Sequence, residues 1–120
     1  MQVRAAVVHK PGDKFVIETL QLRSPLDDEV LVKVQCSGLC GCDVHYMNDS
    51  KEPHPIVMGH EGAGIIEQIG KSVKNFNVGD HVIIATNHCG HCQNCKDGKL
   101  YDCDNVFNFW YGKQVDRKSP

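Results

Sequence analysis

Four cysteines near the end of the chain constrain its folding more than any other feature. They follow the spacing C-x2-C-x2-C-x7-C, at Cys89, Cys92, Cys95 and Cys103. Four thiolates can surround one Zn²⁺ as a closed tetrahedron, which leaves no position free for a substrate. The spacing therefore predicts a structural metal site that folds a lobe at about residues 86–104, rather than a reaction centre.

The cysteine count and the N-terminus favour metal binding over disulfides. Seven cysteines is an odd number, whereas a secreted disulfide framework normally has an even number and follows a signal peptide. The first residues lack a secretory hydrophobic region, so a reducing, cytoplasmic compartment is expected. An iron–sulfur cluster stays open as an alternative occupant of the four cysteines. Cys36 is expected to be a small buried hydrophobic residue on a strand.

The composition indicates one globular domain that has no affinity for nucleic acid or membranes. The chain has 120 residues, of which 41% are hydrophobic and 23% charged, enough for an ordinary core. The net charge is −2 and there is no block of basic residues, which argues against a zinc-ribbon nucleic-acid binder and an anionic membrane surface. The apolar runs are too short to span a bilayer.

Short apolar or alternating segments, separated by Gly and Pro, predict a mainly β fold. Strands are expected at residues 3–8, 15–22, 29–35, 62–69 and 81–85, and one helical turn at 41–47. Many short strands between turn residues are typical of a sandwich or a barrel. No regular strand–helix alternation and no G-x-G-x-x-G occur in these residues, so no dinucleotide-binding Rossmann domain is expected among them.

A second group of possible metal ligands lies upstream of the four cysteines. Cys40 occurs in Gly-Leu-Cys-Gly-Cys-Asp-Val-His, and His60 opens a segment that reads G-H-E-x2-G-x5-G-x2-V. Together with the four-cysteine spacing, these motifs resemble the zinc-dependent, medium-chain alcohol dehydrogenases over roughly residues 2–104. The resemblance implies a GroES-like β-barrel domain at residues 1–104, with the zinc lobe at about 86–104 and a tail at 105–120.

The resemblance also implies an activity. The domain would be the zinc- and substrate-binding half of an NAD(P)-dependent oxidoreductase that converts alcohols to aldehydes or ketones. Two zinc ions would be its cofactors, and NAD or NADP would bind to a Rossmann domain outside these residues, so the chain is expected to be inactive by itself. The substrate would be a small alcohol or carbonyl compound, with aromatic alcohols and polyols both open. Members of the family are usually homo-oligomers.

Four residues of the second group acquire roles from the resemblance. Cys40 and His60 would supply two of three ligands to a catalytic zinc that keeps one open position, and the third ligand would come from further downstream. Asp43 would orient the zinc-bound histidine through its other ring nitrogen. Glu61 would be the acidic neighbour close behind the metal, able to become a ligand itself.

Two further residues correspond to a proton relay. His45 resembles the surface histidine at its end, and an unperturbed imidazole suits that task. Cys42 stands where the family normally has Ser or Thr, and a thiol is a weaker hydrogen-bond donor and a better metal ligand than a hydroxyl. The alternative to an enzyme is a zinc-stabilised structural or interaction module without catalysis.

Overall fold

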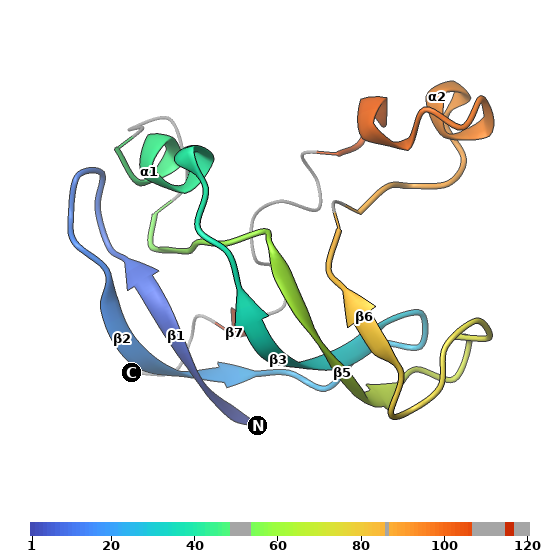
Figure 1. Cartoon of the computed structure of the whole chain (residues 1–120), viewed down its shortest axis with the longest axis horizontal. Coiled ribbons are helices and arrows are strands. Elements are labelled where there is room, and N and C mark those ends of the chain that lie inside the picture. Colours follow the sequence, from blue (N-terminus) through green and yellow to red (C-terminus); the bar gives the residue numbers. More distant parts are fainter. Residues whose placement is uncertain (49–53, 86, 107–114, 117–120) are drawn as a thin grey trace.

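Two antiparallel β-sheets make up most of the fold (Figure 1). The computed structural model describes residues 1–48, 54–85, 87–106 and 115–116. One sheet has the order β4-β1-β2-β7, formed by Ile56–Val57, Gln2–Val8, Val16–Leu22 and Val115–Asp116. The other has the order β3-β5-β6, formed by Val30–Ser37, Gly62–Ile69 and His81–Ile83. The helices are α1 (Gly41–Asn48), α2 (Gln93–Lys96) and the short 3-10 helix η1 (Leu100–Asp102).

The aliphatic core draws on both sheets. Val8 of β1 is fully buried and pairs with Ile56 of β4, while Ile66 of β5 is 1% exposed. Turn residues shape the segment around this core: the backbone N–H of Gly79 donates to the carbonyl of Ile66, and that of Ile66 to the carbonyl of Asp80. Gly79 has a φ of +96°, a conformation that other residues rarely adopt, so it permits the tight turn before β6.

Strands β3 and β5 position the upstream ligands. They pair in antiparallel register from Val30 opposite Ile69 to Ser37 opposite Gly62. The end of β3 therefore lies beside the start of β5. The backbone N–H of Gly38 extends the pairing by donating to the backbone carbonyl of Glu61 at 2.9 Å. Because α1 begins just after β3, the residues immediately before β5 lie close to the start of that helix (Figure 1).

The mainly β prediction is confirmed, with small differences in the limits of the elements. The strand expected at 62–69 has those limits, and the expected helical turn at 41–47 is a helix of eight residues. The prediction of a buried Cys36 is wrong, because the second half of the edge strand β3 is exposed and carries Cys36 with it. Most of the tail expected at 105–120 lies outside the described residues.

None of the helices in the described part of the chain is long and apolar enough to cross a membrane.

Candidate metal centres

The first candidate centre is the cysteine lobe, residues 87–104, which follows β6. Cys95 lies in α2 (Figure 1), and Cys103 directly follows η1. The two short helices therefore bring together sulfurs that are up to 14 residues apart in the sequence. The four sulfurs lie within 4.8 Å of one another, and all seven cysteines of the chain are free thiols. Two sulfurs bound about 2.3 Å from a tetrahedral zinc are separated by about 3.8 Å. The sulfurs of Cys89 and Cys95 are 3.9 Å apart, so the cluster fits such an ion.

The lobe's backbone is arranged to stabilise thiolates. Backbone N–H groups point at two of the sulfurs: that of Cys92 donates to Cys89 Sγ at 3.4 Å, and those of Cys89 and Asn105 donate to Cys103 Sγ at 3.3 and 3.4 Å. Hydrogen bonds from the His91 backbone, and then from Asn105 and Cys92, lower the pKa of Cys89 to about 5. Burial first, and then hydrogen bonding to the neighbouring thiols, raises the pKa of Cys95 to about 12. A divalent cation would replace the proton that such a thiol retains.

Polar contacts hold the rest of the lobe. The side-chain amide of Asn94 donates to the carbonyl of Asp102 at 2.8 Å and to the carboxylate of Asp104 at 3.0 Å. The ring of His91 donates from Nδ1 to the carbonyl of Cys89 at 2.8 Å, which places this histidine beside the cluster. Of the lobe's described residues, only Cys95 and Cys103 are buried, so the lobe has almost no apolar core of its own. Its shape therefore depends on the sulfur cluster.

The second candidate centre lies where β3 ends and β5 begins. Cys40 Sγ and His60 Nε2 are 3.2 Å apart, although 20 residues separate them in the sequence. Cys42 joins them: its sulfur and the two other ligand atoms all lie within 4.8 Å of one another. A sulfur and a nitrogen on one tetrahedral zinc are about 3.5 Å apart, so Cys40 and His60 fit a shared ion with a small adjustment.

Helix capping holds Cys40 in place. Cys40 is the residue before α1, and its sulfur accepts the backbone N–H of Cys42 at 3.2 Å. In return, Asp43 Oδ2 accepts the backbone N–H of Cys40 at 3.0 Å. Asp43, the third residue of the helix, makes the return bond of a capping box, while the sulfur of Cys40 accepts from the second helical residue instead of the third. This contact was not predicted, although the Cys-x-x-Asp spacing at the start of a helix was a signal for it.

The second oxygen of the same carboxylate faces His60. Asp43 is 1% exposed, and its Oδ1 lies 3.7 Å from His60 Nδ1 without a hydrogen-bond partner among the described residues. This distance is slightly too long for the hydrogen bond that the resemblance implies. A buried oxygen without a partner is costly, so a ring N–H on Nδ1 is the group that it best fits. That tautomer leaves Nε2 free to bind a cation beside Cys40.

The structure places the two remaining predicted residues near the centre but outside the ligand group. The carboxylate of Glu61 lies over Gly38, where a Cβ atom would collide with it. His45 is exposed on α1, three residues after Cys42, so the two side chains are on one face of the helix. Its ring contacts the ring of Tyr46 edge to face.

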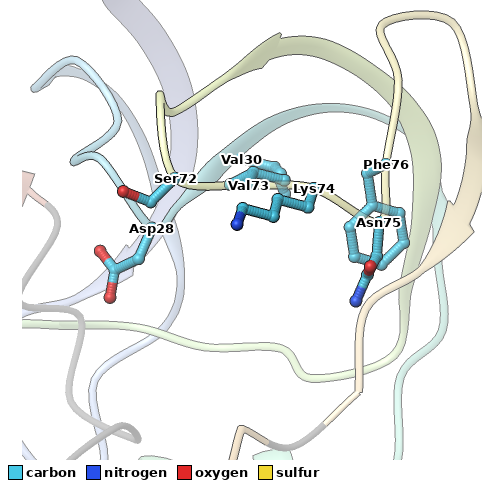
Figure 2. Close-up of a pocket in the computed structure, with 7 residues that line it drawn as sticks. All are labelled: Asp28, Val30, Ser72, Val73, Lys74, Asn75 and Phe76. Carbon is cyan, nitrogen blue, oxygen red and sulfur yellow. The ribbon is translucent and has the colours of Figure 1, made fainter.

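A hollow of about 420 Å³ is found elsewhere, between residues 28–30 and the loop 72–76. Figure 2 shows Asp28, Ser72 and Lys74 around it. Val30 pairs with Ile69, at the opposite end of the β3–β5 pair from Gly62. The hollow is thus separate from both candidate metal centres.

Comparison with known proteins agrees with this geometry. The family model described as the alcohol dehydrogenase GroES-like domain matches residues 26–115. The NDMA-dependent alcohol dehydrogenase of Amycolatopsis methanolica is 43% identical over 106 residues, which are 87% of this chain and 29% of that protein.

Two solved structures are similar as well. The alcohol dehydrogenase zinc-binding domain protein from Burkholderia ambifaria is 41% identical, with a TM-score of 0.89 over 93% of this chain and 30% of that one. The benzyl alcohol dehydrogenase from Acinetobacter calcoaceticus is 40% identical, with a TM-score of 0.86 over 92% of this chain and 31% of that one. The chain thus spans about 30% of the length of these relatives.

The four-cysteine cluster and the group of two cysteines and a histidine are consistent with the structural and catalytic zinc sites of zinc alcohol dehydrogenases. The chain belongs to the zinc-dependent, medium-chain alcohol dehydrogenases, and it contains their GroES-like domain.

Proposed function

We propose that residues 1–104 form the zinc- and substrate-binding domain of an NAD(P)-dependent alcohol dehydrogenase. The observation that carries this proposal is the meeting of Cys40 and His60 at the end of the β3–β5 pair, with a buried carboxylate behind the histidine ring. The separate cysteine lobe, about residues 86–104, would hold a structural zinc. The family consists of NAD(P)-dependent zinc alcohol dehydrogenases, which supports the reaction class.

Each residue of the upstream centre has a task that follows from its surroundings. A bound zinc would supply Lewis acidity toward the oxygen of an alcohol or a carbonyl substrate. Cys40 presents its sulfur at the helix N-terminus, where it accepts the backbone N–H of Cys42 at 3.2 Å. Asp43 keeps the proton of His60 on Nδ1 and so directs Nε2 at the cation. Glu61 adds negative charge near the centre without being in the ligand group.

His45 is placed to exchange a proton with solvent. It is exposed and lies on the same helical face as Cys42. Cys42 would link the centre to this histidine if it takes the relay role that the resemblance implies. A thiol performs that role less well than a hydroxyl, because its S–H is a weak donor.

The substrate class that we propose is a small primary alcohol with an aromatic ring, or the corresponding aldehyde. The support is the likeness to the benzyl alcohol dehydrogenase, which spans 92% of this chain. The nicotinamide cofactor would be held by residues beyond this domain, as in relatives of which the chain covers about 30%.

Metal analysis tests the proposal. The purified chain should bind two zinc ions, and Cys40→Ser should remove one of them while the cysteine lobe keeps the other. Cys36→Ser is the matched control, since Cys36 is exposed and belongs to neither ligand group. A single zinc that is unaffected by Cys40→Ser would instead support a structural module without catalysis.

A further inference from the structure

We propose that Cys40 and Cys42 are an oxidation site of the domain, at which a hydroperoxide joins their two sulfurs in a disulfide. The disulfide takes the sulfur of Cys40 away from the upstream metal centre, so that the centre loses its ion until a thiol reductant restores the ligand. This second step rests on the proposed function, because it needs a metal at Cys40 and His60. The formation of the disulfide itself depends only on the two cysteines.

The two sulfurs lie together at the start of α1. Cys40 precedes the helix and Cys42 is its second residue, and their sulfurs lie within 4.8 Å of one another. The backbone N–H of Cys42 donates to the sulfur of Cys40 at 3.2 Å, which keeps that sulfur directed at the first turn. A disulfide between the two residues is therefore a local change at this end of the helix.

The backbone between the two cysteines permits the bond. Disulfides join residues whose Cα atoms are about 4.4–6.8 Å apart, and residues two positions apart in an α-helix have a Cα separation of about 5.4 Å. The residue between them is Gly41, and a Cβ atom built there would meet no other atom within 4 Å. A glycine gives the short loop that the disulfide closes more conformational freedom than any other residue. Rotation of the exposed Cys42 side chain can then bring the sulfurs to bonding distance.

The other cysteines of the chain are less suited to this reaction. Cys36 is exposed, but it belongs to neither group of neighbouring ligand atoms. Cys95 and Cys103 are buried, and with Cys89 and Cys92 they form the set that one zinc ion would hold in the cysteine lobe. The oxidation of a thiol depends on its exposure as well as on its ionisation. The pair at the start of α1 combines a neighbouring sulfur with access to solvent.

The reaction balances with the peroxide as its only co-reactant. Nε2 of His60 lies 3.2 Å from the sulfur of Cys40, and since Asp43 faces Nδ1, Nε2 can accept the thiol proton. The Cys40 sulfur attacks one peroxide oxygen, the O–O bond breaks, and the other oxygen leaves as water or an alcohol with the proton from His60. The Cys42 sulfur then attacks the sulfenic acid, hydroxide leaves, and the proton of Cys42 converts it to water. The two sulfurs together lose two electrons, which the peroxide gains.

Peptide mapping tests the disulfide. The 120-residue chain, with its cysteine lobe filled with one equivalent of Zn²⁺, is exposed to hydrogen peroxide, and the remaining thiols are then blocked with iodoacetamide. Trypsin releases one peptide, residues 34–51, that carries Cys36, Cys40 and Cys42. We expect this peptide to lose two hydrogen atoms and to carry a single blocked thiol, at Cys36. Dithiothreitol should restore all three thiols.

Variants of single cysteines assign the bond. Cys36→Ser is the matched control, because it leaves Cys40 and Cys42 as the only thiols of the peptide, and it should lose the two hydrogen atoms as readily as the unchanged protein. Cys42→Ser should form no disulfide in this peptide, and Cys42→Ala should behave in the same way. Since Cys42 is exposed, both of its variants should keep the urea midpoint of the unchanged protein.

Metal analysis tests the consequence of the bond. The oxidised chain should bind zinc at the upstream site at least about 10-fold more weakly than the reduced chain, because a sulfur in a disulfide is no longer a thiolate ligand. Dithiothreitol should restore the affinity. In Cys42→Ser, peroxide should cause no loss of zinc that dithiothreitol reverses.

The possible outcomes separate the oxidation site from the proposed function. A disulfide that involves Cys36, or oxidation of the lobe cysteines before the peptide 34–51, would overturn the oxidation site and leave the metal site standing. Equal zinc affinity of the oxidised and reduced chains would overturn the release of the ion. A disulfide between Cys40 and Cys42 in a chain that never binds a second zinc ion would instead support the oxidation site and refute the metal site.

Discussion

One carboxylate contacts both proposed ligands of the upstream centre. Asp43 Oδ2 accepts the backbone N–H of Cys40 at 3.0 Å, while its Oδ1 lies 3.7 Å from Nδ1 of His60. Since Cys40 follows β3 and His60 precedes β5, this buried side chain joins the two ends of the pair that builds the centre. Its removal should therefore weaken both the fold and metal binding. Substitutions that keep or remove the bond to Cys40 should distinguish the two effects.

Asp43→Asn should retain most of the stability and lose metal affinity. An amide oxygen can still accept the Cys40 N–H, but the negative charge behind His60 is lost, and we expect zinc to bind the upstream site about 10- to 100-fold more weakly. Asp43→Ala should show the same loss and also destabilise the fold by about 1 kcal/mol or more, because the capping bond disappears. Zinc titration and urea unfolding measure the two effects.

The control for these variants is Glu67→Gln. Glu67 forms an exposed ion pair with Lys33 at 3.6 Å, far from any ligand group, and its loss should change stability by less than about 1 kcal/mol. Equal zinc affinity in Asp43→Ala and Glu67→Gln would contradict the positioning role of Asp43.

Cys95→Ala should unfold the cysteine lobe and release its metal, leaving both sheets folded. Cys95 is buried at the centre of a lobe with almost no other apolar contact, so the sulfur cluster supplies most of its stability. Limited proteolysis should then cut between residues 87 and 104, and metal content should fall by one ion per chain. Resistance to protease equal to that of Cys36→Ser would count against a structural metal in the lobe.

The cysteine lobe and the β-rich fold could be predicted from local patterns, and the approach of Cys40 to His60 could be expected only from the family resemblance. The spacing from Cys89 to Cys103 predicts a cluster because short loops bring such ligands together, and β5 has its predicted limits because glycines and apolar residues mark it clearly. The exposure of Cys36 depends on which strands pair and which edge stays uncovered, a long-range property that one sequence does not reveal. The contact of Asp43 with Cys40 is local, and the Cys-x-x-Asp spacing at the start of α1 was a signal from which it could have been predicted.

Gly64→Ala should destabilise the fold by about 1–3 kcal/mol. A Cβ atom at Gly64 would collide with the backbone carbonyl of Lys33 on the paired strand and with the side chain of Val32, and the site is buried. Gly41→Ala is the matched control, because a Cβ atom there meets open space at the start of α1 and alanine favours a helix. Thermal unfolding should separate the two variants; equal melting temperatures would mean that β3 and β5 are not in the described register.

The ion pair of Arg23 and Glu29 should contribute stability that is lost in acid. Glu29 receives two hydrogen bonds from the guanidinium at 2.6 and 2.7 Å and one from the backbone N–H of Leu26 at 2.9 Å. The Arg23 hydrogen bond, followed by that of Leu26, lowers the pKa of Glu29 below its ordinary value. A carboxyl whose pKa is lower in the folded state stabilises it at pH above the ordinary value, and less as pH falls through the lowered one.

Glu29→Gln tests whether the stability that this ion pair contributes decreases as the pH falls. In metal-free samples, the variant should be less stable to urea than the unchanged protein near neutral pH, and the difference should shrink as both are taken to about pH 3. The difference between the two proteins removes effects of other carboxyls. A difference that grows in acid would contradict the lowered pKa.

Residues 1–120 by themselves should not oxidise alcohols, even with both metal sites filled. These residues contain no G-x-G-x-x-G turn that could seat the pyrophosphate of a dinucleotide on a helix N-terminus. The side chain of His60 is 50% exposed and Cys42 is exposed, so water has free access where hydride transfer would have to take place. The check is reduced-nicotinamide absorbance with benzyl alcohol and either NAD⁺ or NADP⁺. Turnover that disappears in Cys40→Ala would show that this domain binds the cofactor without a dinucleotide-binding partner. Fusion to the remaining part of the benzyl alcohol dehydrogenase should produce activity that Cys36→Ser retains and Cys40→Ala abolishes.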